Sequence, residues 1–243
     1  MTFVKPIWIL LCLSLIGCGL LPPPPLRVDE TTLSHAQAVA TNAGWGNNVD
    51  ISIDGHRLII STDGIPNHER LEFYALLGGN VIPDPTAAQN HRFTIPLAPH
   101  LSDRQQETRL GPIGVAISGA VFFNPYEGNG QTVALDDNFE VNGVPFIDAC
   151  NGHPTLDGLY HYHGVPYCIT DTIDTAGQHS TLIGYMLDGI PVYGPQDRAG
   201  NAPTDLDACQ GHTGPTPEFP EGVYHYHLLE TPPYSIPCFS GRR

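Results

Sequence analysis

The chain has few basic residues and lacks several common catalytic motifs. Lysine and arginine together number 10 in 243 residues, against 25 aspartates and glutamates, which gives a formal net charge of −15. A surface this acidic argues against nucleic acid or anionic lipid headgroups as partners, whereas it suits cations. The sequence contains no G-x-S-x-G, no phosphate-binding loop, no G-x-G-x-x-G and no C-x-x-C. The serine-hydrolase, nucleotide-binding and thiol-redox classes that use these motifs therefore have no support.

Long helices are also excluded. The 26 glycines and 24 prolines interrupt the chain so often that no long helix fits. What remains are short segments with strand-like patterns at residues 48–62, 70–77, 92–97 and 105–110. The first predicts a hairpin that turns at Asp54-Gly55, and the second could equally be helical. The sequence thus predicts a mainly β fold with long Gly/Pro-rich loops and few short helices.

The longest apolar run lies at the N-terminus and is too short to span a membrane. It covers Ile7–Ile16, follows Lys5 and ends in Leu15-Ile16-Gly17-Cys18. This ending resembles a bacterial lipobox, which implies cleavage of residues 1–17 and lipidation of Cys18, with palmitate among its acyl chains. No aspartate follows the cysteine, so the resemblance implies an outer-membrane lipoprotein, on its periplasmic or surface face. An ordinary signal peptide or a short anchor is the alternative.

The segment after the expected cleavage site is a tether. Pro22–Pro25 predict a stiff, extended polyproline stretch. Residues 29–45 are small and polar, and we expect them to form a mobile approach with at most one helical turn. Residues 18–45 are therefore the expected tether, and residues 46–243 form one domain, a length within reach of a single β domain.

That domain contains an internal duplication. Tyr160-His161-Tyr162-His163 recurs as Tyr224-His225-Tyr226-His227, and each quartet follows a D-A-C-x-G-H segment, at 148–153 and at 207–212. The apolar stretches 113–125 and 183–195 align without a gap but share only four residues, whereas the histidines are retained in both copies. The repeats span about 111–168 and 181–240, and the duplication predicts a pseudo-twofold relation between them. Each apolar stretch should bend at its central glycine, Gly119 or Gly189.

The cysteines divide evenly between the repeats. Of six, Cys12 leaves with the signal peptide and Cys18 is lipidated, which leaves Cys150, Cys168, Cys209 and Cys238. In an exported protein these four predict two disulfides. We favour pairing within each repeat, Cys150 with Cys168 and Cys209 with Cys238, although two other connectivities exist. Thiolate ligation of a metal is the weaker reading in an oxidising compartment.

The repeated histidines predict metal binding. Alternate residues of a strand share one face, so His161 and His163 lie on the side opposite Tyr160 and Tyr162. Two such imidazoles can reach one ion at ~2.0–2.1 Å. His153 and His212 are the candidate third ligands, which gives the sets His153, His161, His163 and His212, His225, His227. They could form two separate sites, or one site merged across the pseudo-twofold axis.

Neutral imidazoles favour zinc or copper, and also iron or nickel, over calcium or magnesium. With an open coordination position, such a site could support a metal-dependent hydrolase or oxidoreductase, for which Asp188 is a candidate acid or base. A turn role for Asp188 in its Asp-Gly pair is the competing interpretation. The alternative for the histidines is a metal-free structural or adhesion module, in which Asp148 and Asp207 orient the rings. Residues 124–130 form a loop that could contact a glycan, although turns commonly have that composition.

With these residues, the sequence resembles the YHYH-domain family, which is named for the quartet. The resemblance covers about residues 92–240 and includes the stretch at 111–127, the C-N-G-H-P and G-L-Y-H-Y-H segments, G-Y-M-L-D-G-I-P-V-Y-G-P and the closing P-C-F-S-G. It implies an exported protein with a domain of unknown function, and it assigns no catalytic residues.

Overall fold

The computed structural model describes residues 30–243. The expected signal peptide, the predicted lipidation site Cys18 and the polyproline stretch lie outside the described residues. Within them the chain forms seventeen strands, two α-helices and one short 3₁₀ turn, so the mainly β fold predicted from the sequence is confirmed.

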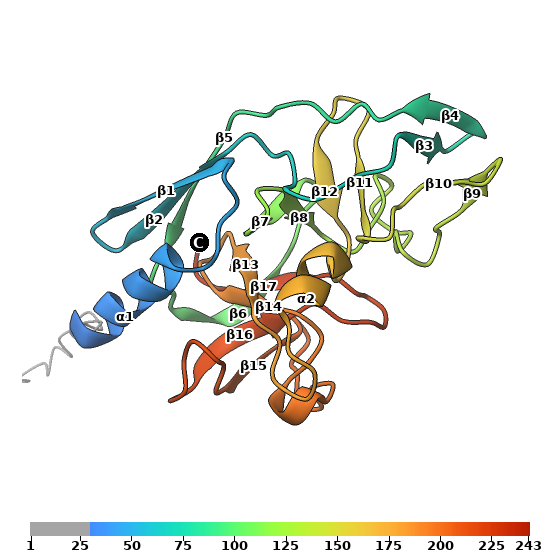
Figure 1. Cartoon of the computed structure of the whole chain (residues 1–243). Coiled ribbons are helices and arrows are strands. Elements are labelled where there is room, and N and C mark those ends of the chain that lie inside the picture. Colours follow the sequence, from blue (N-terminus) through green and yellow to red (C-terminus); the bar gives the residue numbers. More distant parts are fainter. Residues whose placement is uncertain (1–29) are drawn as a thin grey trace, which may run out of the picture.

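The largest element is an eight-stranded sheet built equally from the two repeats (Figure 1). The first repeat contributes β7 (Pro112–Ala116), β8 (Val121–Phe123), β11 (Gly152–Pro154) and β12 (Tyr160–Tyr162). The second contributes β13 (Leu182–Met186), β14 (Pro191–Tyr193), β15 (Gly211–Gly214) and β16 (Val223–His227). Their order is β11-β12-β8-β7-β13-β14-β16-β15, in which equivalent strands lie at mirrored places about the antiparallel β7–β13 pair. This order gives the repeats the predicted pseudo-twofold relation.

The central glycine of each apolar stretch makes the turn between two strands. Gly119 joins β7 to β8 with a φ of +94°, and Gly189 joins β13 to β14 with a φ of +84°. A Cβ atom at Gly189 would lie 2.1 Å from the carbonyl oxygen of Pro96. Both the positive φ and the close approach of another segment therefore require glycine here.

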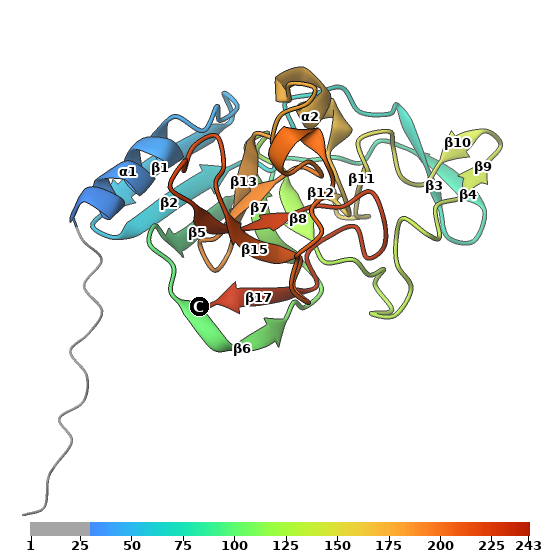
Figure 2. The same ribbon diagram turned by 90° about the horizontal axis from the view of Figure 1, so that it is seen from below.

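Four smaller sheets surround the central one. β1 (Val49–Asp54), β2 (Arg57–Thr62) and β5 (His91–Pro96) form a three-stranded sheet. Three two-stranded sheets pair β3 (Phe73–Leu76) with β4 (Asn80–Pro83), β6 (Leu101–Glu107) with β17 (Cys238–Gly241), and β9 (Glu140–Val141) with β10 (Val144–Pro145). In both views the β3–β4 and β9–β10 hairpins lie at the end of the molecule opposite α1 (Figure 2).

The hairpin over residues 48–62 is confirmed, with its turn one residue later than predicted. Asp54 pairs with Arg57, so Gly55 and His56 form the two-residue loop. The segment 70–77, which the sequence left ambiguous, contains strand β3. Gly78 and Gly79, both at positive φ, turn the chain into β4.

The prediction for residues 29–45 was wrong, because a helix of twelve residues, α1 (Glu30–Thr41), lies there. Its Ala40 is fully buried in a core cluster, and the indole nitrogen of Trp45 donates to the Ala40 carbonyl oxygen at 2.8 Å. The apolar contacts of this helix are with residues distant in sequence, so tertiary packing stabilises it where the local pattern was weak. The second helix, α2 (Tyr167–Ile173), is short, as is the 3₁₀ turn Arg198–Gly200. Among residues 30–243 no helix has the length and apolar character needed to cross a membrane.

Candidate metal centres

Strand pairing brings the third histidine of each repeat to the other two. β11 and β12 are antiparallel and place His153 directly opposite His161, while β15 and β16 place His212 opposite His225. All six histidines predicted from the sequence are buried, none with more than 7% of its surface exposed. A histidine outside each quartet thus joins it through the register of a hairpin.

The first histidine set consists of His153, His161 and His163, whose ligand nitrogens lie within 4.8 Å of one another. The Nε2 atoms of His161 and His163 are 3.0 Å apart. Each Nδ1 faces a backbone carbonyl oxygen, that of Leu159 at 3.1 Å for His161 and that of Asn124 at 2.9 Å for His163. A carbonyl oxygen can only accept a hydrogen bond, so Nδ1 carries the proton and the two Nε2 atoms face each other with lone pairs.

The second histidine set contains His212, His225 and His227, and its nitrogens are arranged in the same way. The Nε2 of His225 lies 3.0 Å from the Nε2 of His212 and 3.0 Å from that of His227. The Nδ1 atoms donate to the Val223 carbonyl at 2.9 Å, to the Gly194 carbonyl at 2.7 Å and, for His212, to the Asp205 carboxylate at 2.7 Å. Three lone pairs therefore converge here.

A fourth histidine that the sequence analysis missed also belongs to the second set. The Nε2 of His179 lies 3.3 Å from that of His225, and its Nδ1 faces the Ser180 carbonyl oxygen at 2.7 Å. The Oδ1 atom of Asp197 lies 3.7 Å from the Nε2 of His179. Continuing the gapless alignment places His179 opposite Arg109 of the first repeat, so the duplication itself concealed it. The available signal was a histidine four residues before the aligned stretch begins.

Burial keeps five imidazoles of the two sets neutral. Loss of solvent lowers the pKa of His163 and His225 to about 4 and that of His227 to about 3, although hydrogen bonds to backbone carbonyls oppose the shift. Burial, reinforced by neighbouring imidazoles, also holds the pKa of His153 and His161 well below its usual value. At neutral pH these rings are in the form that binds a metal ion.

The D-A-C-x-G-H segments position tyrosines as well as histidines. In each segment one carboxylate oxygen of the aspartate accepts hydrogen bonds from the backbone N–H groups of the cysteine and the glycine. The other oxygen accepts the hydroxyl of the first tyrosine of the quartet, at 2.7 Å for Asp148 with Tyr160 and at 2.8 Å for Asp207 with Tyr224. The idea that these aspartates orient the imidazoles was therefore wrong, because they lie with the tyrosines.

Glycine is required in these segments because a tyrosine ring covers it. A Cβ atom on Gly152 would lie 2.4 Å from the hydroxyl oxygen of Tyr160, and one on Gly211 would lie 2.1 Å from that of Tyr224. The residue before each glycine, Asn151 or Gln210, has a positive φ. The motif is therefore a tight turn that bonds to the tyrosine and then enters the strand with the third histidine.

Asp188 does not join the histidines. Its Oδ2 accepts the hydroxyl of Tyr226 at 2.7 Å and the backbone N–H of Gly241 at 2.9 Å, and its side chain is fully buried. Because the tyrosines alternate with the histidines along β16, this carboxylate lies on the tyrosine side of the strand. The placement favours the turn role over the suggested acid or base role. Burial raises the pKa of Asp188.

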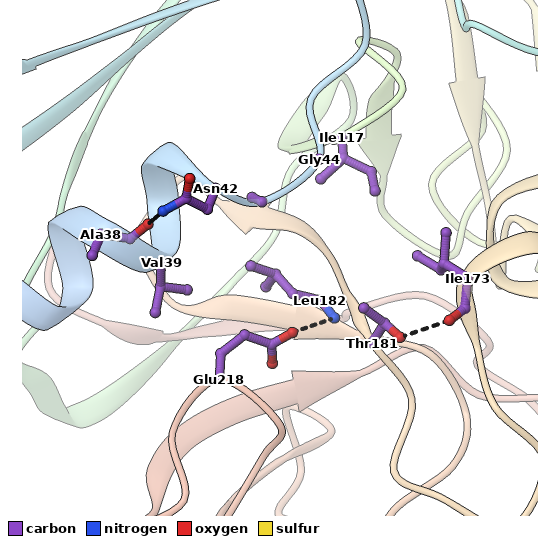
Figure 3. Close-up of a pocket in the computed structure, with 10 residues that line it drawn as sticks. Ala38, Val39, Asn42, Gly44, Ile117, Ile173, Thr181, Leu182 and Glu218 are labelled. Carbon is purple, nitrogen blue, oxygen red and sulfur yellow. Dashed lines mark hydrogen bonds between the residues drawn. The ribbon is translucent and has the colours of Figure 1, made fainter.

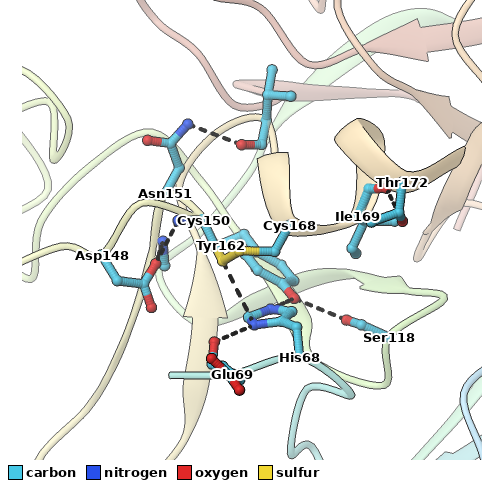
Figure 4. The surroundings of a disulfide bond; sticks show 12 residues. His68, Glu69, Ser118, Asp148, Cys150, Asn151, Tyr162, Cys168, Ile169 and Thr172 are labelled. Carbon is cyan, nitrogen blue, oxygen red and sulfur yellow. Dashed lines mark hydrogen bonds between the residues drawn. A yellow bond between two sulfur atoms is a disulfide. The ribbon is translucent and has the colours of Figure 1, made fainter. Parts of the chain in front are cut away.

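The two disulfides are those expected, Cys150–Cys168 and Cys209–Cys238. Cys150 and Cys168 also lie near His68, whose Nε2 is 2.6 Å from the Tyr162 hydroxyl (Figure 4). Tyr162 in turn is 2.9 Å from Ser118, which occupies the position equivalent to Asp188. Since both sulfurs are bonded to each other, thiolate ligation by these cysteines is excluded. This cluster is a packed hydrogen-bond group and not a metal centre.

The two histidine sets are separate. β12 and β16, which carry the quartets, have four strands between them in the central sheet. The alternative of one site merged across the pseudo-twofold axis is therefore wrong, because the axis passes between β7 and β13 while the quartets lie toward opposite edges.

Among the described residues, one pocket opens onto the first histidine set. It encloses about 320 Å³, and all three histidines of the set line it together with mostly apolar side chains. A second hollow of about 480 Å³ lies between α1, β13 and the end of α2, and contains no histidine (Figure 3). The first set thus has access to a cavity large enough for a small molecule.

Comparison with known proteins identifies a single family relationship. The chain matches the YHYH protein family over residues 92–202 and 196–241, which include every histidine of both sets. No curated protein and no solved structure matches the chain.

Proposed function

This chain belongs to the YHYH protein family, and from the arrangement of the family's repeated histidines we propose that it binds a transition-metal ion at each of its two histidine sets. The observation that carries the proposal is the close approach of unprotonated nitrogens. Two ligand nitrogens that are each ~2.0–2.1 Å from one ion lie roughly 3.0–3.4 Å apart. The Nε2 separations of 3.0–3.3 Å match this spacing in both sets.

The competing function is a metal-free structural or adhesion module of the cell envelope. Such a lattice needs a proton between each pair of nitrogens, one ring donating and the other accepting. Here the carbonyl or carboxylate partners hold the protons on Nδ1 in both rings of each close Nε2 pair. Lone pairs that face one another in a buried site repel unless a cation lies between them, so the geometry favours the metal.

The donor atoms limit the choice of metal. Neutral imidazole nitrogens suit zinc, copper, iron and nickel, and zinc or copper would be the usual occupants of an all-histidine site. The second set has a hydrogen bond from the ligand His212 to the Asp205 carboxylate, an arrangement that orients a metal-binding imidazole and raises its basicity. We therefore assign the tighter binding to the second set.

The protein that carries these sites is exported in this proposal. Two disulfides are typical of an oxidising compartment. The lipobox-like Leu15-Ile16-Gly17-Cys18 supports attachment to the outer membrane through Cys18, with the tether leading to the domain.

Metal stoichiometry tests the proposal. Equilibrium dialysis of the full-length mature protein against zinc, followed by elemental analysis, should give two ions per chain. His161→Ala should retain one, His225→Ala one, and the double variant none. His100→Ala, which changes an exposed histidine outside both sets, should still bind two.

The melting temperature provides an independent measurement. Added metal should raise it with concentration, because a ligand that binds only the folded state stabilises it by RT ln(1 + [L]/Kd). The double variant should not respond. If zinc, copper, iron and nickel all leave the melting temperature of the wild-type protein unchanged, the metal-binding proposal is rejected and the structural module is the supported function.

A further inference from the structure

The two histidine sets differ in the residues that surround them, although their ligands are equivalent. The position of His179 in the second repeat is occupied in the first by the exposed Arg109. The position of Asp205, which bonds to His212, is occupied by Phe146, whose ring lies edge-on to His153 at 4.4 Å. The first set therefore has one imidazole fewer and an apolar neighbour in place of a carboxylate.

These differences leave the first set short of negative charge and of ligands. Three neutral imidazoles do not compensate either positive charge of a divalent ion, whereas Asp197 and Asp205 lie beside the second set. A tetrahedral ion held by three protein nitrogens also has one position open. In a site with little water, an anionic ligand at this position gains much more than it would in solution.

The open side of the first set is an apolar pocket. Phe123 stacks on His161 with ring centroids 3.8 Å apart, and Phe146 covers His153. Leu77, Leu110 and Leu156 line the same cavity, although 64%, 50% and 75% of their respective surfaces are exposed. Large apolar side chains exposed around a cavity are typical of a surface that is covered when a ligand binds.

We propose that the ion of the first histidine set binds the carboxylate of a small organic acid, whose apolar body occupies this pocket. The inference rests on the proposed metal binding and names the ligand class of one of its two sites. The protein as a whole carries a formal net charge of −15, which repels anions at long range. The attraction therefore comes from the ion, and the acid should not bind to the metal-free protein.

Glu127 supplies a polar group in the same lining. Its Oε1 is buried and has no hydrogen-bond partner among the described residues. Burial, together with the nearby Asp137, raises the pKa of this carboxyl group, which favours its protonated form. A protonated carboxyl can donate to the free oxygen of a bound carboxylate, whereas a second ionised carboxylate would repel it.

Cobalt-substituted protein tests the proposal, because the visible spectrum of Co²⁺ responds to a change of ligand. His225→Ala retains the first set and His161→Ala retains the second. Each variant is loaded with Co²⁺ and titrated with benzoate and with acetate. In His225→Ala we expect a spectral change that saturates with benzoate at a concentration about tenfold lower than with acetate, because only benzoate buries an apolar body. In His161→Ala neither acid should change the spectrum.

Substitution of the pocket wall provides a second measurement. Leu156→Ser in the His225→Ala background should leave Co²⁺ binding intact and reduce the preference for benzoate about threefold. Leu101→Ser, which changes a residue 48% exposed outside the pocket lining, is the matched control and should not alter the preference.

Four results would overturn the proposal. Equal affinity for the two acids would show that the pocket does not bind the apolar body of the ligand. A spectral response of similar size in His161→Ala would show that the acid does not bind specifically at the first set. Co²⁺ that is bound by both variants but never responds to an acid would reject the carboxylate while leaving the proposed function standing. Failure of both variants to bind Co²⁺ would reject the proposed function as well. Where His225→Ala does not fold, His227→Ala, which removes a histidine shared by both possible ligand groups of the second set, serves in its place.

Discussion

At the scale of the residue, the deciding feature is which nitrogen of each histidine carries the proton. The backbone carbonyls of Leu159 and Asn124 in the first repeat have their equivalents in Val223 and Gly194 in the second. Because these groups only accept hydrogen bonds, they direct the Nε2 lone pairs of the four quartet histidines into the two sites. Main-chain atoms therefore preorganise the imidazoles. Their positions are equivalent in the two repeats, although the apolar side chains of the repeats differ.

Burial of these imidazoles predicts that the metal-free protein is sensitive to acid. A histidine whose pKa is about 6.5 when unfolded and about 3 to 4 in the folded protein binds protons preferentially in the unfolded state. Its contribution to stability is complete above pH 6.5 and is lost as the pH falls toward 4. The melting temperature of metal-free protein should therefore fall between pH 7 and pH 4.5.

A matched variant isolates the histidines from other titrating groups. Asp148 and Asp188, whose pKa burial raises, act in the opposite direction, because protonation favours their folded environment. His227→Gln cannot gain the charge, so its melting temperature should fall less over the same pH range than that of the wild type. An equal fall in both proteins would show that His227 does not contribute to the acid sensitivity.

At the scale of the element, two antiparallel hairpins do the assembly. The β11–β12 and β15–β16 hairpins each place the third histidine across from the quartet. The cysteine of the D-A-C-x-G-H turn, which precedes each hairpin, forms a disulfide. Cys209 is bonded to Cys238, the first residue of β17, so this disulfide ties the edge of the central sheet to the β6–β17 pair. The covalent link holds the turn that leads into His212.

Removal of this disulfide should therefore weaken both the fold and the second metal centre. The paired change Cys209→Ser, Cys238→Ser opens a loop closed over 29 residues, and we expect it to lower the free energy of unfolding by about 2–4 kcal/mol. Urea unfolding measures this loss, and zinc affinity should fall at the second set, read in the His161→Ala background.

The first set provides the control for the disulfide experiment. The same cysteine pair changed in the His225→Ala background should leave zinc affinity at the first set unaltered, because four strands separate the quartets. Affinity that falls equally at both sets would point to general loss of the fold and contradict a local role for the disulfide.

At the scale of the whole molecule, two candidate metal centres lie toward opposite edges of one pseudo-symmetric sheet, and helix α1 packs against a core cluster of the same domain. The duplication built two equivalent ligand frames, after which the surroundings diverged into one four-histidine set with carboxylates and one three-histidine set with a pocket.

Lipidation of that segment is the expected outcome for the intact chain. Cells that express the protein should incorporate labelled palmitate into it, and Cys18→Ala should abolish the label and release the protein from the membrane fraction. Cys12→Ala changes a cysteine inside the apolar run and should lower only the efficiency of export, if anything. Label that persists in Cys18→Ala would show that the lipobox interpretation is wrong.

The sequence by itself determined the parts that are local or duplicated. The six repeated histidines, the cysteine pairing, the β character and the glycine turns could be predicted because period-two alternation, chain punctuation and repeat identity are properties of short segments. These signals failed for α1, because the contacts that stabilise its apolar face come from residues far along the chain.

Only the tertiary structure decided how the histidines are used. His179 and Asp205 reach the second set from segments outside the matching motifs, and Phe146 and Glu127 reach the first set in the same way. The separation of the two sets follows from the order of strands in the sheet. That order cannot be predicted from the hydrophobic periodicity of the sequence. The physical reason is that a binding site depends on distances between residues remote in sequence, and those distances are fixed by strand register and packing rather than by any local pattern.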